Sequence, residues 1–167
     1  MRRGAVRSVV VAGLLALGAG VPGSAQASVL PSVRASVADE PEADVAYHGR
    51  VVLAGARLRI WMVPENNGPA ALPNATVRVR LSAELADRQE LAGGCARAGV
   101  REVVCETGRL PLHGRGRHIG LLLELREPSP EVVVRVDTWW NGGATDRNHA
   151  NNEHVVLALD TGDAYAF

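Results

Sequence analysis

Apolar residues at every second position are the feature that most constrains the fold of this 167-residue chain. Successive side chains of a strand point to opposite faces, so such alternation indicates a strand with one buried and one solvated face. Five runs show the pattern. Their in-phase residues are Leu58, Ile60 and Met62; Val77, Val79 and Leu81; Ile119, Leu121, Leu123 and Leu125; Val132, Val134 and Val136; and Val155, Leu157 and Leu159. We expect each set to face a common core.

Turn-forming residues separate these runs. They gather in short clusters at residues 66–69, 93–94, 114–116, 128–130 and 141–143. Gly and Asn tolerate positive φ and Pro fixes φ, and chain reversals need both properties. Ser82 to Leu91 is the one helical competitor, and we expect a strand end followed by a loop or a single helical turn there. The sequence therefore predicts an all-β fold, an immunoglobulin-like antiparallel β-sandwich of about seven strands.

The first 27 residues have the order of a secretory signal peptide. Three arginines precede an apolar run from Val9 to Gly20, and the small-x-small site Ala25-Gln26-Ala27 follows. The run is shorter than the roughly 20 apolar residues of a membrane-spanning helix, so we expect cleavage and secretion to the extracellular space. Pro, Ser, Ala and acidic residues then indicate a flexible linker. The expected organisation is a signal peptide over 1–27, a linker over 28–43, a domain over 44–160 and a C-terminal tail over 161–167.

The charge pattern argues against nucleic acid as a partner. Beyond residue 27, fifteen arginines stand against eighteen acidic residues, which gives a net charge near −3. Both signs alternate along the chain, and no basic stripe is present to neutralise phosphates. We therefore expect no nucleic-acid binding, and no stable membrane insertion after the signal peptide is removed.

Cys95 and Cys105 are the only cysteines. In exported sequence they predict a structural disulfide, which would stabilise the fold by roughly 2.5–3 kcal/mol. Two alternatives stay open. A reactive thiol would need an activating base, and a metal site would need a second cysteine pair at metal-ligand spacing.

The densest polar stretch runs from Asp146 to His154. Its Asn and Asp side chains are typical of a loop that hydrogen-bonds to nearby backbone amides. Alternatively, the stretch could bind calcium, because its oxygens are hard ligands at short spacing, although the pattern is not that of an EF-hand. The calcium candidates are Asp146, Asn148, Asn151 and Glu153. His149 and His154 could ligate zinc, but no third ligand is identified.

Trp139 and Trp140 precede Asn141 and two glycines. Adjacent residues of a strand point to opposite faces, so we expect one tryptophan to be buried and the other to be exposed. An exposed tryptophan beside Asn141 would form a stacking platform for a sugar or a partner protein. The alternative is a core tryptophan with a neighbour that covers the strand end. Trp61 has the same ambiguity, because it lies out of phase with its own run.

Sequence signatures of enzymes are missing. The chain has no G-x-S-x-G elbow, no H-E-x-x-H motif and no phosphate-binding glycine loop. The sequence thus favours a protein that is not an enzyme and needs no cofactor. A small secreted hydrolase is the remote alternative.

Four motifs occur in an order that resembles a known family. They are Asn66-Asn67-Gly68-Pro69, Asn74 to Val79, the cysteine pair with its second member inside Val104 to Leu110, and Asp146-Arg147-Asn148-x-x-Asn151-Asn152. Together they resemble the cell-adhesion-related domain found in bacteria (CARDB-like) and the similar conserved repeat domain of bacterial surface proteins. The resemblance covers about Asp44 to Asp160, as a single copy.

The resemblance implies an exported immunoglobulin-like sandwich of seven strands without defined catalytic residues. It implies that certain turn and loop residues fix where strands begin and end. These residues are Asn67, Gly68, Asp146, Asn151 and Asn152. It also implies a binding or structural role toward a protein or glycan at the cell surface. The aromatic tail, residues 161–167, lies outside the family pattern, and we expect it to pair along an edge strand or to mark a subtype.

Overall fold

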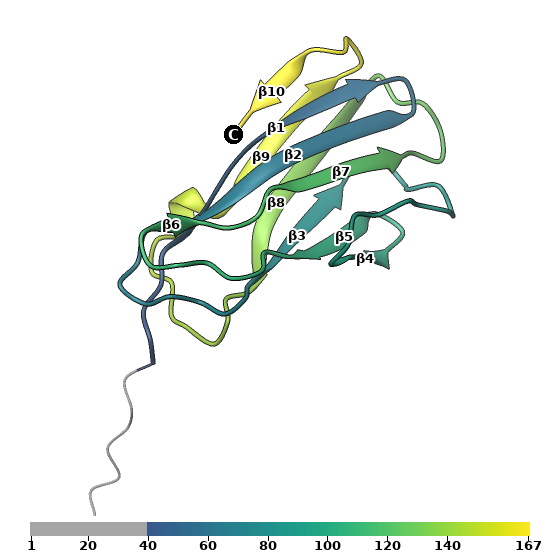
Figure 1. Ribbon diagram of the computed structural model, residues 1–167. Helices are drawn as coiled ribbons and strands as arrows, with labels where there is room; N and C mark the ends of the chain where they lie inside the picture. Colours follow the sequence, from purple (N-terminus) through teal and green to yellow (C-terminus); the bar gives the residue numbers. More distant parts are fainter. Residues whose placement is uncertain (1–39) are drawn as a thin grey trace, which may run out of the picture. The chain divides into compact units, whose positions relative to one another are not determined.

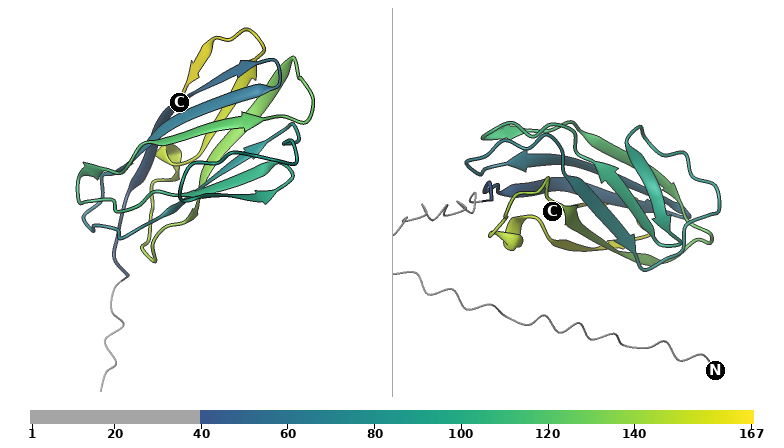
Figure 2. Two further views of the ribbon diagram at one scale, coloured as in Figure 1. Left: turned by 45° about the vertical axis from the view of Figure 1, so that its right-hand side comes forward. Right: turned by 90° about the horizontal axis from the view of Figure 1, so that it is seen from below.

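The structure is a computed structural model that describes residues 40–167. The predicted signal peptide and residues 28–39 of the predicted linker lie outside the described residues. Within 40–167, ten strands and one short 3₁₀ turn, His149–Asn151, form two antiparallel sheets packed as a sandwich (Figures 1 and 2). This confirms the predicted all-β sandwich. The same part of the chain contains no helix that is long and apolar enough to cross a membrane.

The first sheet has the order β10-β1-β2-β6, and β7 also pairs with β2. Its strands are β1 (Val45–Ala54), β2 (Arg57–Asn66), β6 (Gly114–Arg115), β7 (Ile119–Glu124) and β10 (Ala164–Ala166). β1 and β2 form a long hairpin in which Val45 lies opposite Asn66 and Ala54 opposite Arg57. Gly55 begins its turn with a φ of 60°, a conformation that favours glycine.

The second sheet has the order β4-β5-β3-β8-β9. Its strands are β3 (Thr76–Leu81), β4 (Cys95–Gly99), β5 (Glu102–Glu106), β8 (Glu131–Trp140) and β9 (His154–Leu159). Cys95 lies directly opposite Cys105 in the β4–β5 pair, and the two form the expected disulfide. The predicted count of about seven strands is too low, because β4, β6 and β10 are short and carry too few large apolar residues to produce a periodic signal.

The core between the sheets is almost entirely aliphatic. The inward residues of β2, β3, β7 and β8 are buried in the phase that alternation predicts. Tyr47 is the only aromatic ring among the fully buried side chains of residues 40–167, and its hydroxyl lies 2.8 Å from Thr138 Oγ1. Burial raises the pKa of the Tyr47 hydroxyl. Residues 82–91 form a loop, and an isolated bridge joins its Leu85 to Leu125, the residue that follows β7.

For the fifth alternating run, in β9, the prediction of the buried face is wrong. The exposed residues are Val155, Leu157 and Leu159, whereas Val156 and Ala158 face the core. Pairing with β8 sets this phase, because Val156 lies opposite the buried Val134. Val155 to Leu159 are all apolar, so their pattern alone does not distinguish the two faces of the strand.

Both flanks of the predicted domain contact it. The yellow β10 runs antiparallel beside the blue β1 (Figure 1), so the tail pairs along an edge strand. At the other end, Glu42 forms a bridge with Thr145, and Ala43 is buried in the core. The contacts of the domain therefore begin before Asp44, inside the predicted linker.

Candidate functional site

The Asp146 carboxylate joins the polar loop to the start of β1. Its Oδ2 accepts hydrogen bonds from the Val45 backbone N–H and from Asn152 Nδ2, each at 2.9 Å. Its Oδ1 accepts from the Asn148 backbone N–H, also at 2.9 Å. Asn152 is buried, so Asp146 satisfies an amide that has no access to water. The loop is thus held to a strand that lies 101 residues earlier in the chain.

The other calcium candidates take different positions. Asn151 Nδ2 donates to Asp44 Oδ1 at 2.7 Å, and Asn148 Nδ2 lies 3.4 Å from the same oxygen. Glu153 is exposed. No group of three or more His, Cys, Asp or Glu side chains suited to a metal ion occurs in residues 40–167. Three of the four candidates therefore lie in one hydrogen-bonded loop, in which the Asp146 oxygens already accept N–H donors.

The two histidines of this loop do not lie together. His149 is exposed in the 3₁₀ turn. His154, at the start of β9, has its Nε2 3.1 Å from the Asn151 carbonyl oxygen, and its ring packs on Phe167 with centroids 5.1 Å apart. His154 is thus part of the packing between β9 and the C-terminal tail.

The 66–70 turn depends on Asn66, a residue of the predicted turn motif to which the sequence assigned no role of its own. Asn66 is fully buried, its Oδ1 accepts from the Gly68 backbone N–H at 3.1 Å, and its Nδ2 donates to the Ala70 carbonyl at 2.7 Å. Asn67 is exposed and donates its backbone N–H to the Asp44 carbonyl at 2.7 Å. A Cβ at Gly68 would stand 2.6 Å from the Ala43 carbonyl carbon, so this close approach requires glycine. The available signal was an Asn two residues before a Gly at the end of a strand.

Trp139 and Trp140 are both exposed, at 52% and 48%, so the expectation that one of them is buried is wrong. The register between β3 and β8 shifts at this point: Val77 pairs with Thr138, but Thr76 pairs with Trp140. Trp139 is therefore the extra residue of a bulge, and strict alternation fails across it. The adjacent Asn141 donates from Nδ2 to the Ala144 carbonyl at 3.3 Å, while its Oδ1 is buried without a hydrogen-bond partner among the described residues.

Trp139 lies beside an ion pair on the outer face of the second sheet. The Arg78 guanidinium is 5.3 Å from the Trp139 ring centroid and donates from Nε and Nη2 to the two oxygens of Asp137, at 2.8 and 3.0 Å. Arg80 donates to the same carboxylate. Partial burial alone would raise the pKa of Asp137, but the hydrogen bonds and charges of the two arginines lower it overall. The bond to Asp137 raises the pKa of Arg78.

Trp61 lies on the outer face of the first sheet and is 40% exposed. The Arg50 guanidinium is 5.4 Å from its ring centroid, and the His118 ring meets it edge-on at 4.9 Å. Beside it is a hollow of about 390 Å³, here called the Trp61 hollow. Its lining includes His48, Arg50, Trp61, Glu65, Arg115 and Phe167.

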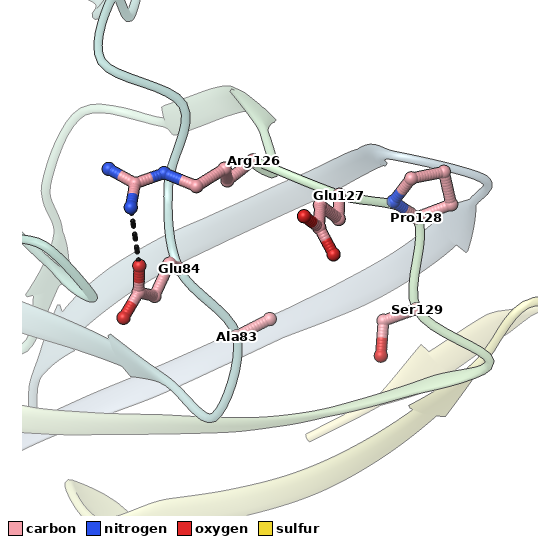
Figure 3. A pocket seen from close by; sticks show the side chains of 6 residues that line it. All are labelled: Ala83, Glu84, Arg126, Glu127, Pro128 and Ser129. Atoms are coloured by element: carbon pink, nitrogen blue, oxygen red, sulfur yellow. Dashed lines mark hydrogen bonds and ion pairs between the residues drawn. The ribbon is translucent and has the colours of Figure 1, made fainter.

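A second hollow, of about 440 Å³, lies beside the turn that joins β7 to β8 (Figure 3). Glu84 binds Arg126 at 2.8 Å across it, and the Ser129 hydroxyl donates to the Glu131 carbonyl at 2.7 Å. Figure 3 shows Glu127, Pro128 and Ser129 along the chain that continues from Arg126. Its lining contains no histidine and no aromatic ring, so it offers a ligand no stacking surface, and the Ser129 hydroxyl is already hydrogen-bonded to a backbone carbonyl.

Comparison with known proteins adds no relative. No protein-family model matches the chain, no curated protein matches it, and no solved structure matches it. The resemblance to the cell-adhesion-related domain stays a prediction. The class that the fold itself defines is an antiparallel β-sandwich that carries all of its tryptophans on its surface.

Proposed function

We propose that the protein is a secreted, non-catalytic β-sandwich module that binds a protein or a glycan at the cell exterior. The observation that carries this proposal is the exposure of all three tryptophans, 40% for Trp61, 52% for Trp139 and 48% for Trp140. Aliphatic side chains fill the core, so the tryptophans are not needed there. Burial of a tryptophan ring by a partner contributes strongly to the binding free energy, and tryptophan is enriched among the residues that dominate binding.

Two features support an extracellular location. The N-terminal sequence has the order of a signal peptide. The Cys95–Cys105 disulfide is of a kind that persists in oxidising compartments. Sequencing the N-terminus of protein recovered from culture medium tests this directly, and we expect it to begin at Ser28.

A non-catalytic role is supported by how the polar groups are used. Ser129, the hydroxyl in the hollow beside the β7–β8 turn, donates to a backbone carbonyl, and Arg126 there pairs with Glu84. Asp137, the carboxylate with a lowered pKa, accepts hydrogen bonds from two arginines. Perturbed groups of this kind also occur in structural ion pairs, and these contacts give Asp137 such a structural role.

A second candidate is a calcium-binding module that uses the Asp146–Glu153 loop. The observation that favours it is Asn151 Oδ1, which is buried without a hydrogen-bond partner among the described residues. The N–H donors that occupy both oxygens of Asp146 disfavour it. Calorimetric titration of metal-free protein with calcium separates the two, because a binding heat with a raised melting temperature would support the calcium module alone.

Sedimentation with cell envelopes tests the main proposal. The protein is incubated with envelope of the source cells, and with separate protein and glycan fractions of it. We expect the wild type to sediment with one fraction and a Trp61→Ala/Trp139→Ala/Trp140→Ala variant to stay in solution. A Val155→Ala/Leu157→Ala variant, which removes exposed aliphatic surface instead, is the matched control and should sediment. Failure of the wild type to sediment with any fraction would contradict the proposal.

A further inference from the structure

On the outer face of the first sheet, small residues flank the two large side chains of the Trp61 hollow. Across the outer face, Arg50 pairs with Trp61, and Trp61 pairs with Gly120 on β7. On the other side, Ala166 of β10 pairs with Arg50. A Cβ at Gly120 would meet no atom within 4 Å, so the outer face is open above Gly120, a residue that does not itself line the hollow. The ring and the guanidinium therefore stand above a shallow surface that a ligand can reach.

The charges of the hollow favour an anion. Among residues 40–167, Arg50 takes part in no ion pair, and its guanidinium is already held against the Trp61 ring. The carboxylate of the hollow, Glu65, is 3.5 Å from Arg115 and 3.9 Å from His48. The Arg115 side chain is 73% exposed, so this contact is weak and Arg115 can turn to a ligand. Arginine forms a two-pronged hydrogen-bonded pair with a carboxylate, which makes a carboxylate the natural ligand group.

The remaining groups distinguish a sugar from other anions. Hydroxyl groups both donate and accept hydrogen bonds, and the hollow offers an acceptor, Glu65, next to its arginine donors. The Trp61 ring provides an apolar surface for the C–H face of a sugar ring. A volume of about 390 Å³ lies within the usual range for small-molecule sites. An inorganic anion would leave the ring and Glu65 unused, and an acidic peptide would bring Glu65 backbone N–H groups but no hydroxyl groups from its carboxylate side chains.

We propose that the Trp61 hollow binds a saccharide that carries carboxylate groups, such as a segment of an acidic polysaccharide. Trp61 stacks on the sugar ring, Arg50 and Arg115 bind the carboxylate, and Glu65 accepts from hydroxyls. This inference rests on the proposed function, since it names the class of partner and the surface that binds it. Trp139 differs, because the arginine over its ring already pairs with a carboxylate, Asp137, through two hydrogen bonds.

Calorimetry with hexagalacturonate and with its neutral methyl ester tests the charge requirement. We expect the acid to bind at least tenfold more tightly than the ester, with affinity falling as salt rises because charge is exposed in the site. Trp61→Ala should weaken binding of the acid at least tenfold, and Trp61→Phe should weaken it less. Arg50→Ala should also weaken it about tenfold.

A control lies on the same strand. Arg59→Ala removes an exposed arginine from the outer face of β2, next to Trp61 but outside the hollow. It should change the affinity less than twofold. Because Trp61 is on the surface, Trp61→Ala should keep the wild-type melting temperature within a few degrees, which confirms that any lost affinity reflects the site.

Several results would overturn the inference. They are no binding of the acid at millimolar concentration, equal binding of the ester, an unchanged affinity in Trp61→Ala, and equal binding of a hexaglutamate peptide, which would assign the hollow to acidic peptides. The proposed function is tested separately. If the saccharide fails but tryptophan-dependent sedimentation with envelope persists, the module binds a different partner, and only the assignment of this hollow is wrong.

Discussion

Asn66, Thr107 and Asn152 are buried although their side chains are polar. Each stays buried because a loop supplies its hydrogen bonds: the Thr107 hydroxyl, for example, accepts from the Ala75 backbone N–H at 2.9 Å and donates to the Gly108 carbonyl at 2.8 Å. Composition indicates that Asn and Gly form turns here. Which Asn of the Asn66-Asn67 pair faces inward depends on the register of β2 against β1, and the turn residues themselves do not encode that register.

Asp146 gives the sharpest prediction at the level of single residues. Asp146→Ala removes the acceptor of three hydrogen bonds and leaves the buried Asn152 amide without a partner. We expect the free energy of unfolding in urea to fall by about 2 kcal/mol, since an unsatisfied buried polar group carries its full desolvation cost.

Asp163→Ala is the matched control for this measurement. Asp163 is an exposed carboxylate in the turn that follows β9, and its loss should change the free energy of unfolding by less than about 0.5 kcal/mol. Equal small effects for both variants would show that the Asp146 network does not hold the loop to β1.

The strands differ in how well the sequence predicts them. In β2, β3, β7 and β8 the inward residues are large and apolar, and most of their outward neighbours are polar or glycine. Both the existence of these strands and their buried faces are therefore predictable. The buried face of β9 was predicted wrongly because its residues 155–159 are all apolar. Pairing with β8 decides which of them face the core. The prediction that one of the adjacent tryptophans is buried was wrong for a related reason, since the bulge at Trp139 arises only when β3 and β8 pair. The Trp61 hollow is lined by residues of four strands, so its position could not be predicted before the pairing of those strands was known.

The β4–β5 pair depends on its disulfide more than on packing. β4 is an edge strand with the sequence CARAG, and none of its residues is fully buried. In the chain-entropy model, a Cys95→Ala/Cys105→Ala variant should lose about 3 kcal/mol of unfolding free energy, because ten residues of sequence separate the linked positions. Hydrogen exchange should accelerate first in β4, while β3 and β8 keep their protection.

Reduction of the wild type provides the control. Dithiothreitol should lower the stability of the wild type to that of the double variant and leave the double variant unchanged. A double variant as stable as the oxidised wild type would show that side-chain packing alone holds β4 in place.

At the level of the whole domain, the C-terminal tail joins the two sheets along one side. Phe167 exchanges two backbone hydrogen bonds with Gly49 of β1, at 2.9 and 3.0 Å, and its ring packs on His154 of β9. Gly49 leaves room for that ring, since a Cβ there would lie 2.5 Å from Phe167 Cζ. Tyr165 also packs against the core. The aromatic tail thus covers a side that the aliphatic strands alone would leave open.

Removing this cover should loosen the two sheets together. We expect Phe167→Ala to lower the free energy of unfolding by about 1–2 kcal/mol, less than a fully buried phenylalanine would cost, because the ring is only partly buried. Amide exchange at Gly49 should also accelerate. Leu112→Ala, at a side chain that is 49% exposed, is the matched control and should leave both quantities nearly unchanged. Phe167→Leu should recover part of the loss, because an aliphatic side chain still fills some of the space. If Phe167→Ala were as stable as the wild type, the β1 and β9 edges would be held by the remaining core alone, and the tail would be an appendage and not a part of the sandwich.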